Sequence, residues 1–173
     1  MSTTMRIAAG SAFPGLSIAR VGGGHVAPAS GEGWRLFVVY RGRHCPLCKA
    51  YLRTLDAMIE DFAAAGISVS VASADTGEKA AADVAEHGWR FPVGFGLTVA
   101  QMQALGLYVS APRSPHETDR PFPEPGLFLI NPAGQVQVVD VSNAPFARPD
   151  LGGILRGARF IQERAYPVRG THG

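Results

Sequence analysis

Residues 35–62 constrain the fold more than any other stretch of the chain. A continuous run of apolar, β-favouring side chains from 36 to 40 predicts a buried strand. After a short basic loop, apolar side chains recur every three or four residues from 48 to 62, which predicts an amphipathic helix. Pro46 suits the first helical position, where an N–H group is not needed. Cys45 is therefore expected at the helix cap, with Cys48 one turn further on the same face.

This position favours redox chemistry. A helix N-terminus stabilises a thiolate, because its N–H groups are unpaired and its dipole end is positive. The loop and the first helical turn add four basic residues: Arg41, Arg43, His44 and Lys49. Such surroundings lower the pKa of a thiol from about 8.5 by about one to several units. Because side chains three apart on a helix lie roughly 5–6 Å apart at Cβ, Cys45 and Cys48 can cycle between a dithiol and a disulfide.

Two other interpretations of the cysteines compete with a redox pair. They could form half of a zinc site with two of the five histidines: His25, His44, His87, His116 and His172. Structural zinc motifs usually pair their histidines at tight spacing or bring a second cysteine pair, and this sequence has neither, so we expect no metal. The cysteines could also be inert buried thiols. Their spacing of three at a strand-to-helix junction argues against that.

Composition excludes several classes of function. The chain has 173 residues, 46% apolar and 17% charged, which predicts one globular domain over 1–173. Net charge is +2 and 14 of the 16 basic residues are arginines scattered along the sequence, so no nucleic-acid surface is expected. No apolar run approaches the roughly 20 residues needed to span a membrane. Without an apolar signal segment at residues 1–10, we expect a cytoplasmic protein, where a cysteine pair is usually catalytic or redox-active.

The remaining segments predict a mixed α/β protein. An extension at 1–33, with a turn at 22–24 between short strands, precedes the first central strand. The next predicted elements are a strand at 67–71, helices at 76–87 and 98–105, and an extended piece at 91–95. A proline-rich surface loop at 111–125, with a solvated His116 and Glu117, leads to a hairpin of strands at 127–130 and 135–141 joined by a turn at 131–134. A helix at 148–164 and an irregular tail at 166–173 complete the chain. Helical crossovers imply parallel strands and the hairpin adds antiparallel ones. The expected fold is a central mixed β-sheet flanked by helices on both faces.

Several motifs carry a family resemblance. They are W-R-L-F-V-V-Y-R-G-R-H-C-P-L-C, then G-I-S-V-S-V-A-S-A-D, H-G-W-R-F-P-V, A-L-G-L-Y-V and P-G-L-F-L-I-N-P-A-G-Q-V. Over residues 8–165 the chain resembles the thioredoxin fold, and within it the peroxiredoxin-like proteins of the alkyl hydroperoxide reductase/thiol-specific antioxidant group. In ordinary peroxiredoxins the peroxide-reducing cysteine follows Pro-x-x-x-Thr/Ser-x-x. With Cys48 in that place, the proline falls at Arg41, the threonine at Cys45 and a later arginine near Pro125, so both signature elements are missing.

The resemblance implies two assignments of the sulfurs. In a thioredoxin-like protein, Cys45 is the exposed nucleophile of low pKa, Cys48 resolves the mixed disulfide, and Pro125 is a cis proline lying against the pair. In a peroxidase, one thiolate attacks a hydroperoxide and the other condenses with the sulfenic acid. Such a peroxidase also needs an arginine: Arg41 and Arg43 are the nearest in sequence, and Arg148 is a more speculative candidate. We favour a thiol–disulfide oxidoreductase, with the thiol peroxidase as the alternative.

His44 stands where thioredoxins often carry tryptophan, immediately before Cys45. If protonated, it would stabilise the Cys45 thiolate, so His44→Ala is expected to raise the pKa of Cys45. A solvated loop histidine is the other interpretation.

The expected partners are those of a redox enzyme. The resemblance implies no cofactor beyond the cysteine pair, an external thioredoxin- or glutathione-type reductant, and either a protein disulfide or a hydroperoxide as substrate. Redoxins often pair, so a homodimer is possible. A non-catalytic binding module with the redoxin fold is the third hypothesis, and an unreactive, buried Cys45 would favour it.

Overall fold

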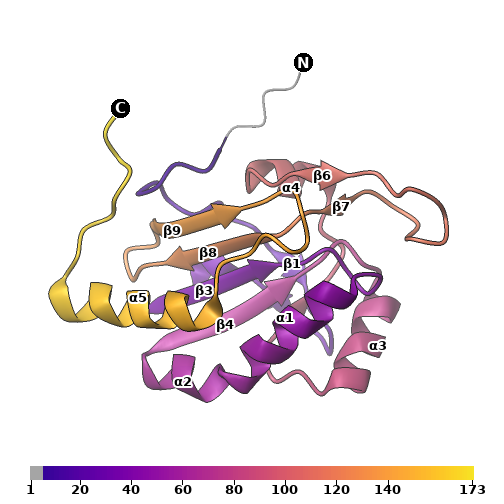
Figure 1. Ribbon diagram of the computed structural model, residues 1–173, viewed down its shortest axis with the longest axis horizontal. Helices are drawn as coiled ribbons and strands as arrows, with labels where there is room; N and C mark the ends of the chain where they lie inside the picture. The colour runs from indigo at the N-terminus through magenta and orange to yellow at the C-terminus, as the bar shows by residue number, and fades with distance from the viewer. Residues whose placement is uncertain (1–5) are drawn as a thin grey trace.

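A five-stranded mixed sheet forms the centre of the protein in a computed structural model that describes residues 6–173 (Figure 1). The strand order is β5-β4-β3-β8-β9. The bounds are β3 (Trp34–Val39), β4 (Ile67–Ala72), β5 (Val93–Gly94), β8 (Gly126–Ile130) and β9 (Val136–Val141). β3, β4 and β5 are parallel, whereas β8 and β9 run antiparallel to their neighbours. The predicted hairpin with its turn at 131–134 is confirmed: Gly134 N donates to Asn131 O at 2.9 Å.

Four helices, all in the lower half of Figure 1, cover one face of the sheet: α1 (Pro46–Ala57), α2 (Ile59–Ala64), α3 (Gly77–His87) and α5 (Leu151–Arg164). The long helix expected after the cysteines is in fact two, because the backbone at Met58 leaves the helical conformation (φ −102°, ψ 7°). The last helix begins at Leu151 and not at Arg148. Its cap is Asp150, whose carboxylate accepts from Gly153 N at 2.7 Å.

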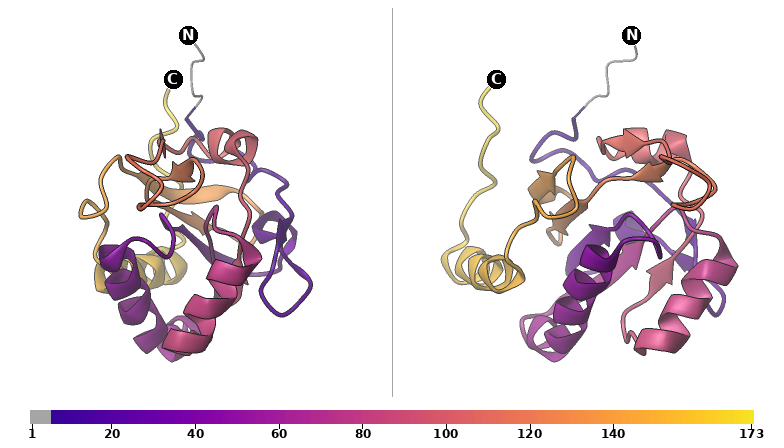
Figure 2. Two further views of the ribbon diagram at one scale, coloured as in Figure 1. Left: turned by 90° about the vertical axis from the view of Figure 1, so that its right-hand side faces the viewer. Right: turned by 45° about the vertical axis from the view of Figure 1, so that its right-hand side comes forward.

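The other face is covered by α4 (Val99–Ala104) and by the N-terminal extension, which contributes to the core. The strands β1 (Ile18–Ala19) and β2 (His25–Val26) pair through the predicted glycine turn, and a short 3₁₀ helix, η1 (Pro28–Ser30), follows. Phe13 makes edge-to-face contacts with Phe37 of β3 and Phe128 of β8. Figure 2 shows this segment running along the side of the sheet away from α1 and α5.

The segment 111–125 was predicted to be a surface loop, and this is wrong for its last part. β6 (Val109–Ser110) pairs with β7 (Phe122–Pro123), and residues 122–125 are buried. The ring of Phe122 packs against the cysteine loop. The sequence of this segment has no apolar periodicity from which that burial could be predicted. His116 is exposed as expected, but the Glu117 side chain is only 8% exposed and ion-pairs with Arg113.

The tail at 166–173 contains no helix or strand, as predicted. In the described part of the chain, no helix combines the length and the apolar character that crossing a membrane requires.

Two glycines of the fold predict opposite responses to alanine. A Cβ at Gly126 in β8 would press into the side chains of Leu107 and Phe128, both buried. At Gly157 in α5, a Cβ would meet no atom within 4 Å. Overpacking should make Gly126→Ala cost about 1–3 kcal/mol of unfolding free energy, whereas Gly157→Ala should gain about 0.5–1 kcal/mol from helix propensity. Urea unfolding measures both changes in unfolding free energy, and changes of the same sign in the two variants would contradict this packing.

Candidate redox site

Cys45 caps α1 and Cys48 lies in its first turn, as the sequence predicts. The Cys45 backbone is extended (φ −108°, ψ 103°), and its sulfur accepts from Cys48 N at 3.3 Å. Both cysteines are free thiols. Their burial differs from the expectation of an exposed Cys45, because Cys45 is 1% and Cys48 0% exposed. The pair lies in the core under the cysteine loop, so a large substrate cannot reach either sulfur without movement of the chain.

The two sulfurs differ in how readily they lose a proton. Interaction with the Cys48 side chain lowers the pKa of Cys45 most, and the Cys48 N–H and Arg41 lower it further against the effect of burial. Burial raises the pKa of Cys48, and the neighbouring Cys45 adds to this rise, while Arg148 opposes it. The pair therefore loses its first proton easily and its second with difficulty. The pair thus carries a single negative charge, on Cys45, and the remaining proton is on Cys48.

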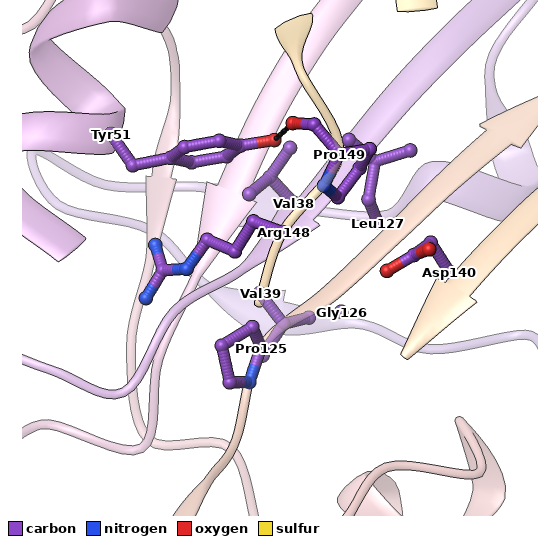
Figure 3. A pocket seen from close by; sticks show the side chains of 9 residues that line it. All are labelled: Val38, Val39, Tyr51, Pro125, Gly126, Leu127, Asp140, Arg148 and Pro149. Carbon is purple, nitrogen blue, oxygen red and sulfur yellow. Dashed lines mark hydrogen bonds between the residues drawn. The ribbon is translucent and has the colours of Figure 1, made fainter. Parts of the chain in front are cut away.

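Arg148, from the segment between β9 and α5, reaches Cys48. Its Nη2 donates to Cys48 Sγ at 2.6 Å, and its guanidinium stacks over the Tyr51 ring at 5.0 Å. Tyr51 is held in turn, since its hydroxyl donates to Pro149 O at 2.8 Å (Figure 3). The Arg148 Nε and Nη1 atoms are buried and have no hydrogen-bond acceptor in the described protein. No carboxylate among the described residues forms an ion pair with Arg148, so the sulfur is its one acceptor there.

Arg41 approaches the pair from the other side. Its guanidinium lowers the pKa of Cys45, stacks on Phe122 at 4.9 Å and forms an ion pair with the buried Glu124 at 3.0 Å between Nε and Oε2. The cysteine pair is thus flanked by Arg41 near one sulfur and Arg148 near the other.

Arg43, the other loop arginine expected at the site, is directed away from it. Its backbone N–H donates to Asp75 Oδ2 at 2.7 Å, and its guanidinium pairs with Asp83 and Glu86 of α3. Asp83, Glu86 and His87 bring possible metal-ligand atoms within 4.8 Å of one another. The guanidinium already supplies the positive charge that both carboxylates require, so this cluster anchors the cysteine loop to α3.

His44 has a different environment from the one expected. Its ring contacts Phe122 edge-to-face at 4.6 Å. Burial, and then the positive charge of Arg41, lower the pKa of His44. This shift disfavours the protonated imidazole that was expected to stabilise a thiolate. Arg41 supplies the positive charge instead.

Pro125 lies beside the site but without the expected backbone conformation. The described residues contain no cis peptide bond. Pro125 lines a small cleft together with Tyr51, Gly126 and Arg148 (Figure 3).

Comparison with a family model decides the ancestry of this site. Residues 9–139 match the model described as the AhpC/TSA family. The chain belongs to the AhpC/TSA family. It is a thiol-dependent oxidoreductase with a thioredoxin-like fold, as predicted.

Solved structures of this fold include a variant of peroxiredoxin 6 from Arenicola marina, at 20% identity over 92% of this chain and 75% of that one, with a TM-score of 0.76. A reduced 2-Cys peroxiredoxin from Plasmodium vivax gives 18% identity, coverage of 91% and 83%, and a TM-score of 0.76. AhpC from Mycobacterium bovis gives 14% identity over 96% of this chain and 98% of that one, with a TM-score of 0.75. At these identities the likeness concerns the fold alone. No curated protein sequence matches this AhpC/TSA chain significantly.

Sequence reasoning missed three residues of the site: Tyr51, Phe122 and Glu124. Tyr51 occupies an ordinary helical position. Glu124 carried a weak signal, because it is a charged residue directly before Pro125 and an apolar strand. Only the fold shows that it meets Arg41.

The two loop arginines form a matched pair for testing the electrostatics. Removing the positive charge at Arg41 should raise the pKa of the cysteine pair by about one unit or more, because an opposite charge near an ionised group stabilises it by that order. Arg43→Gln should leave the pKa nearly unchanged, and His44→Ala should have a smaller effect than Arg41→Gln. The thiolate ultraviolet absorbance followed against pH measures all three variants. Equal shifts for Arg41→Gln and Arg43→Gln would contradict this geometry.

Proposed function

We propose that this protein is a thiol-dependent peroxidase in which Cys48 attacks a hydroperoxide and Cys45 completes an internal disulfide. The observation that carries the proposal is Arg148, which contacts Cys48 Sγ and keeps two further nitrogens without a protein acceptor. A guanidinium has only donors. The free N–H groups can therefore bind a peroxide oxygen next to the sulfur that attacks it.

The leaving group distinguishes peroxide reduction from disulfide exchange. Cleavage of an O–O bond releases hydroxide or alkoxide, and fixed donors directed at that developing charge lower the barrier. Disulfide exchange releases a thiolate, which needs less help. Burial points the same way, since cysteines that are 1% and 0% exposed are easier for a small hydroperoxide to reach than for a folded protein disulfide.

The remaining proton gives the reaction a balanced course. The proton moves from Cys48 to Cys45, and Arg148 stabilises the resulting Cys48 thiolate. This thiolate attacks the terminal oxygen of ROOH, the O–O bond breaks, and Cys48 becomes a sulfenic acid while the proton on Cys45 passes to RO⁻ to give ROH. The Cys45 thiolate then attacks the Cys48 sulfur, forms the disulfide and expels hydroxide.

An external thiol must then restore the dithiol. We propose a reductant of the thioredoxin or glutathione type, in keeping with a cytoplasmic location. The reduction supplies two electrons and two protons to the disulfide.

A second candidate, the thiol–disulfide oxidoreductase favoured by the sequence, has its own support. Cys45 caps the helix with a lowered pKa and Cys48 lies behind it with a raised one, an arrangement suited to attack by Cys45 on a substrate disulfide. The two candidates predict different substrates and different roles for Arg148.

Turnover with two oxidants separates the candidates. The reduced protein should consume hydrogen peroxide or an organic hydroperoxide rapidly and reduce a model protein disulfide slowly. Arg148→Gln should slow peroxide consumption by about 100-fold, as expected for loss of one donor to a developing oxyanion, and should affect disulfide reduction much less. Fast disulfide reduction, sluggish reaction with peroxide and an indifferent Arg148→Gln variant would instead support the oxidoreductase.

A further inference from the structure

Glu124 is a buried carboxylate that the proposed reaction does not use. It is 4% exposed and follows directly after β7. Its Oε2 lies 3.0 Å from Arg41 Nε, and its Oε1 accepts from Ser110 Oγ at 2.8 Å. Its backbone N–H donates to Tyr108 O at 2.8 Å. Side chain and backbone are therefore both fixed, and a fixed, buried negative charge lies next to the arginine of the redox site.

Arg41 is held between Glu124 and Cys45. The Phe122 ring lies against its guanidinium at 4.9 Å. Arg41 is four residues before Cys45, and the turn between them is closed by a hydrogen bond that Cys45 N donates to Gly42 O at 3.2 Å. The guanidinium that pairs with the Glu124 carboxylate therefore also acts on the Cys45 sulfur, whose pKa it lowers. In a poorly hydrated site, a carboxylate this close offsets much of the positive charge.

We propose that Glu124 is a positioning residue of the redox site, which sets through Arg41 how strongly Cys45 holds its negative charge. The consequence concerns the balance between the two sulfurs. A bare Arg41 would fix the negative charge on Cys45 and disfavour the proton shift that creates the Cys48 thiolate. With Glu124 in place, Cys45 keeps enough basicity to accept the proton.

Among the described residues, Glu124 is the carboxylate that pairs with Arg41, whereas Asp75, another buried carboxylate at the cysteine loop, accepts from Arg43 N at 2.7 Å. His44 from the loop, Arg148 from the segment before α5 and Tyr40 at the end of β3 face the pair or its arginine. The lowered pKa of His44 and the raised pKa of Tyr40 both favour the uncharged forms, and the Arg148 guanidinium is positive. None of these three groups therefore contributes a negative charge, whereas Glu124 does.

Titration of the reduced protein without substrate tests the proposal. Glu124→Gln keeps the shape and removes the charge, so the midpoint of the thiolate absorbance should fall by about 0.5–1 pH unit. Glu124→Asp keeps the charge but withdraws it by one methylene group, and its midpoint should lie between those of wild type and Glu124→Gln. Glu117→Gln, which removes another arginine-paired carboxylate from the same hairpin, is the control and should leave the midpoint unchanged.

The outcomes are distinct. A lowered midpoint in Glu124→Gln, with Glu124→Asp intermediate, supports the proposal. A midpoint at or above the wild-type value in the folded variants would overturn it, and circular dichroism verifies folding. Should Glu124→Gln fail to fold, Glu124→Asp decides by the same criterion.

The rate of peroxide consumption is a second readout, and it rests on the proposed function. Glu124→Gln should lower kcat more than it raises KM, because the proton shift between the sulfurs becomes harder. The titration uses no substrate. If the protein proves inactive towards peroxide, the proposed function fails while the titration still tests Glu124.

Discussion

A negative charge buried in a pair of cysteines is the constraint on which the site depends. Charges taken out of water must be compensated nearby, or the group takes up a proton instead. Here the compensation comes from the start of α1 and from two arginines, Arg41 beside Cys45 and Arg148 beside Cys48. Each arginine is held by its own partners, Glu124 and Phe122 for one and the Tyr51 ring for the other. Much of the surrounding structure serves to fix these two guanidinium groups.

The register of the central sheet explains how Arg148, 100 residues after Cys48, reaches it. Val39 at the end of β3 lies opposite Gly126, and Gly126 lies opposite Val141 at the end of β9. The C-terminal ends of β3 and β9 therefore lie at the same end of the sheet, and the segments that follow them leave it there. Glu124 and Pro125, which precede β8, lie at that end of the sheet as well. Three distant segments meet there, next to the start of α1, because β8 begins and β9 ends beside the end of β3.

The sequence predicted the local structure well and the long-range contacts poorly. Strand β3, the capped helix and the cysteine pair are encoded in a single run of residues, so periodicity and capping rules suffice for them. The glycine turn at 22–24 and the turn at 131–134 were equally local. Arg41 and Arg43 looked equivalent in sequence, and only the position of α3 shows that Arg43 binds its carboxylates instead of the pair.

Other differences have the same origin. The roles of Pro125 and His44 rest on analogy with thioredoxins, but His44 packs against Phe122 and lies near Arg41, so that burial and the arginine charge lower its pKa. The proline-rich segment looked like a surface loop because its apolar residues are few and without periodicity. Phe122 and Glu124 are nevertheless buried, since each meets a partner contributed by the cysteine loop. Such pairings depend on the tertiary fold and leave no pattern in the sequence.

The identity of the attacking sulfur is the most direct test of this account. Single-turnover mixing of reduced protein with one equivalent of hydroperoxide, followed by a sulfenic-acid trap and mass spectrometry, distinguishes the cysteines. The account predicts that Cys45→Ser still consumes the peroxide and carries the trapped sulfenic acid on Cys48, whereas Cys48→Ser consumes almost none. A sulfenic acid on Cys45 in the Cys48→Ser variant, formed as fast as the wild-type reaction, would contradict it.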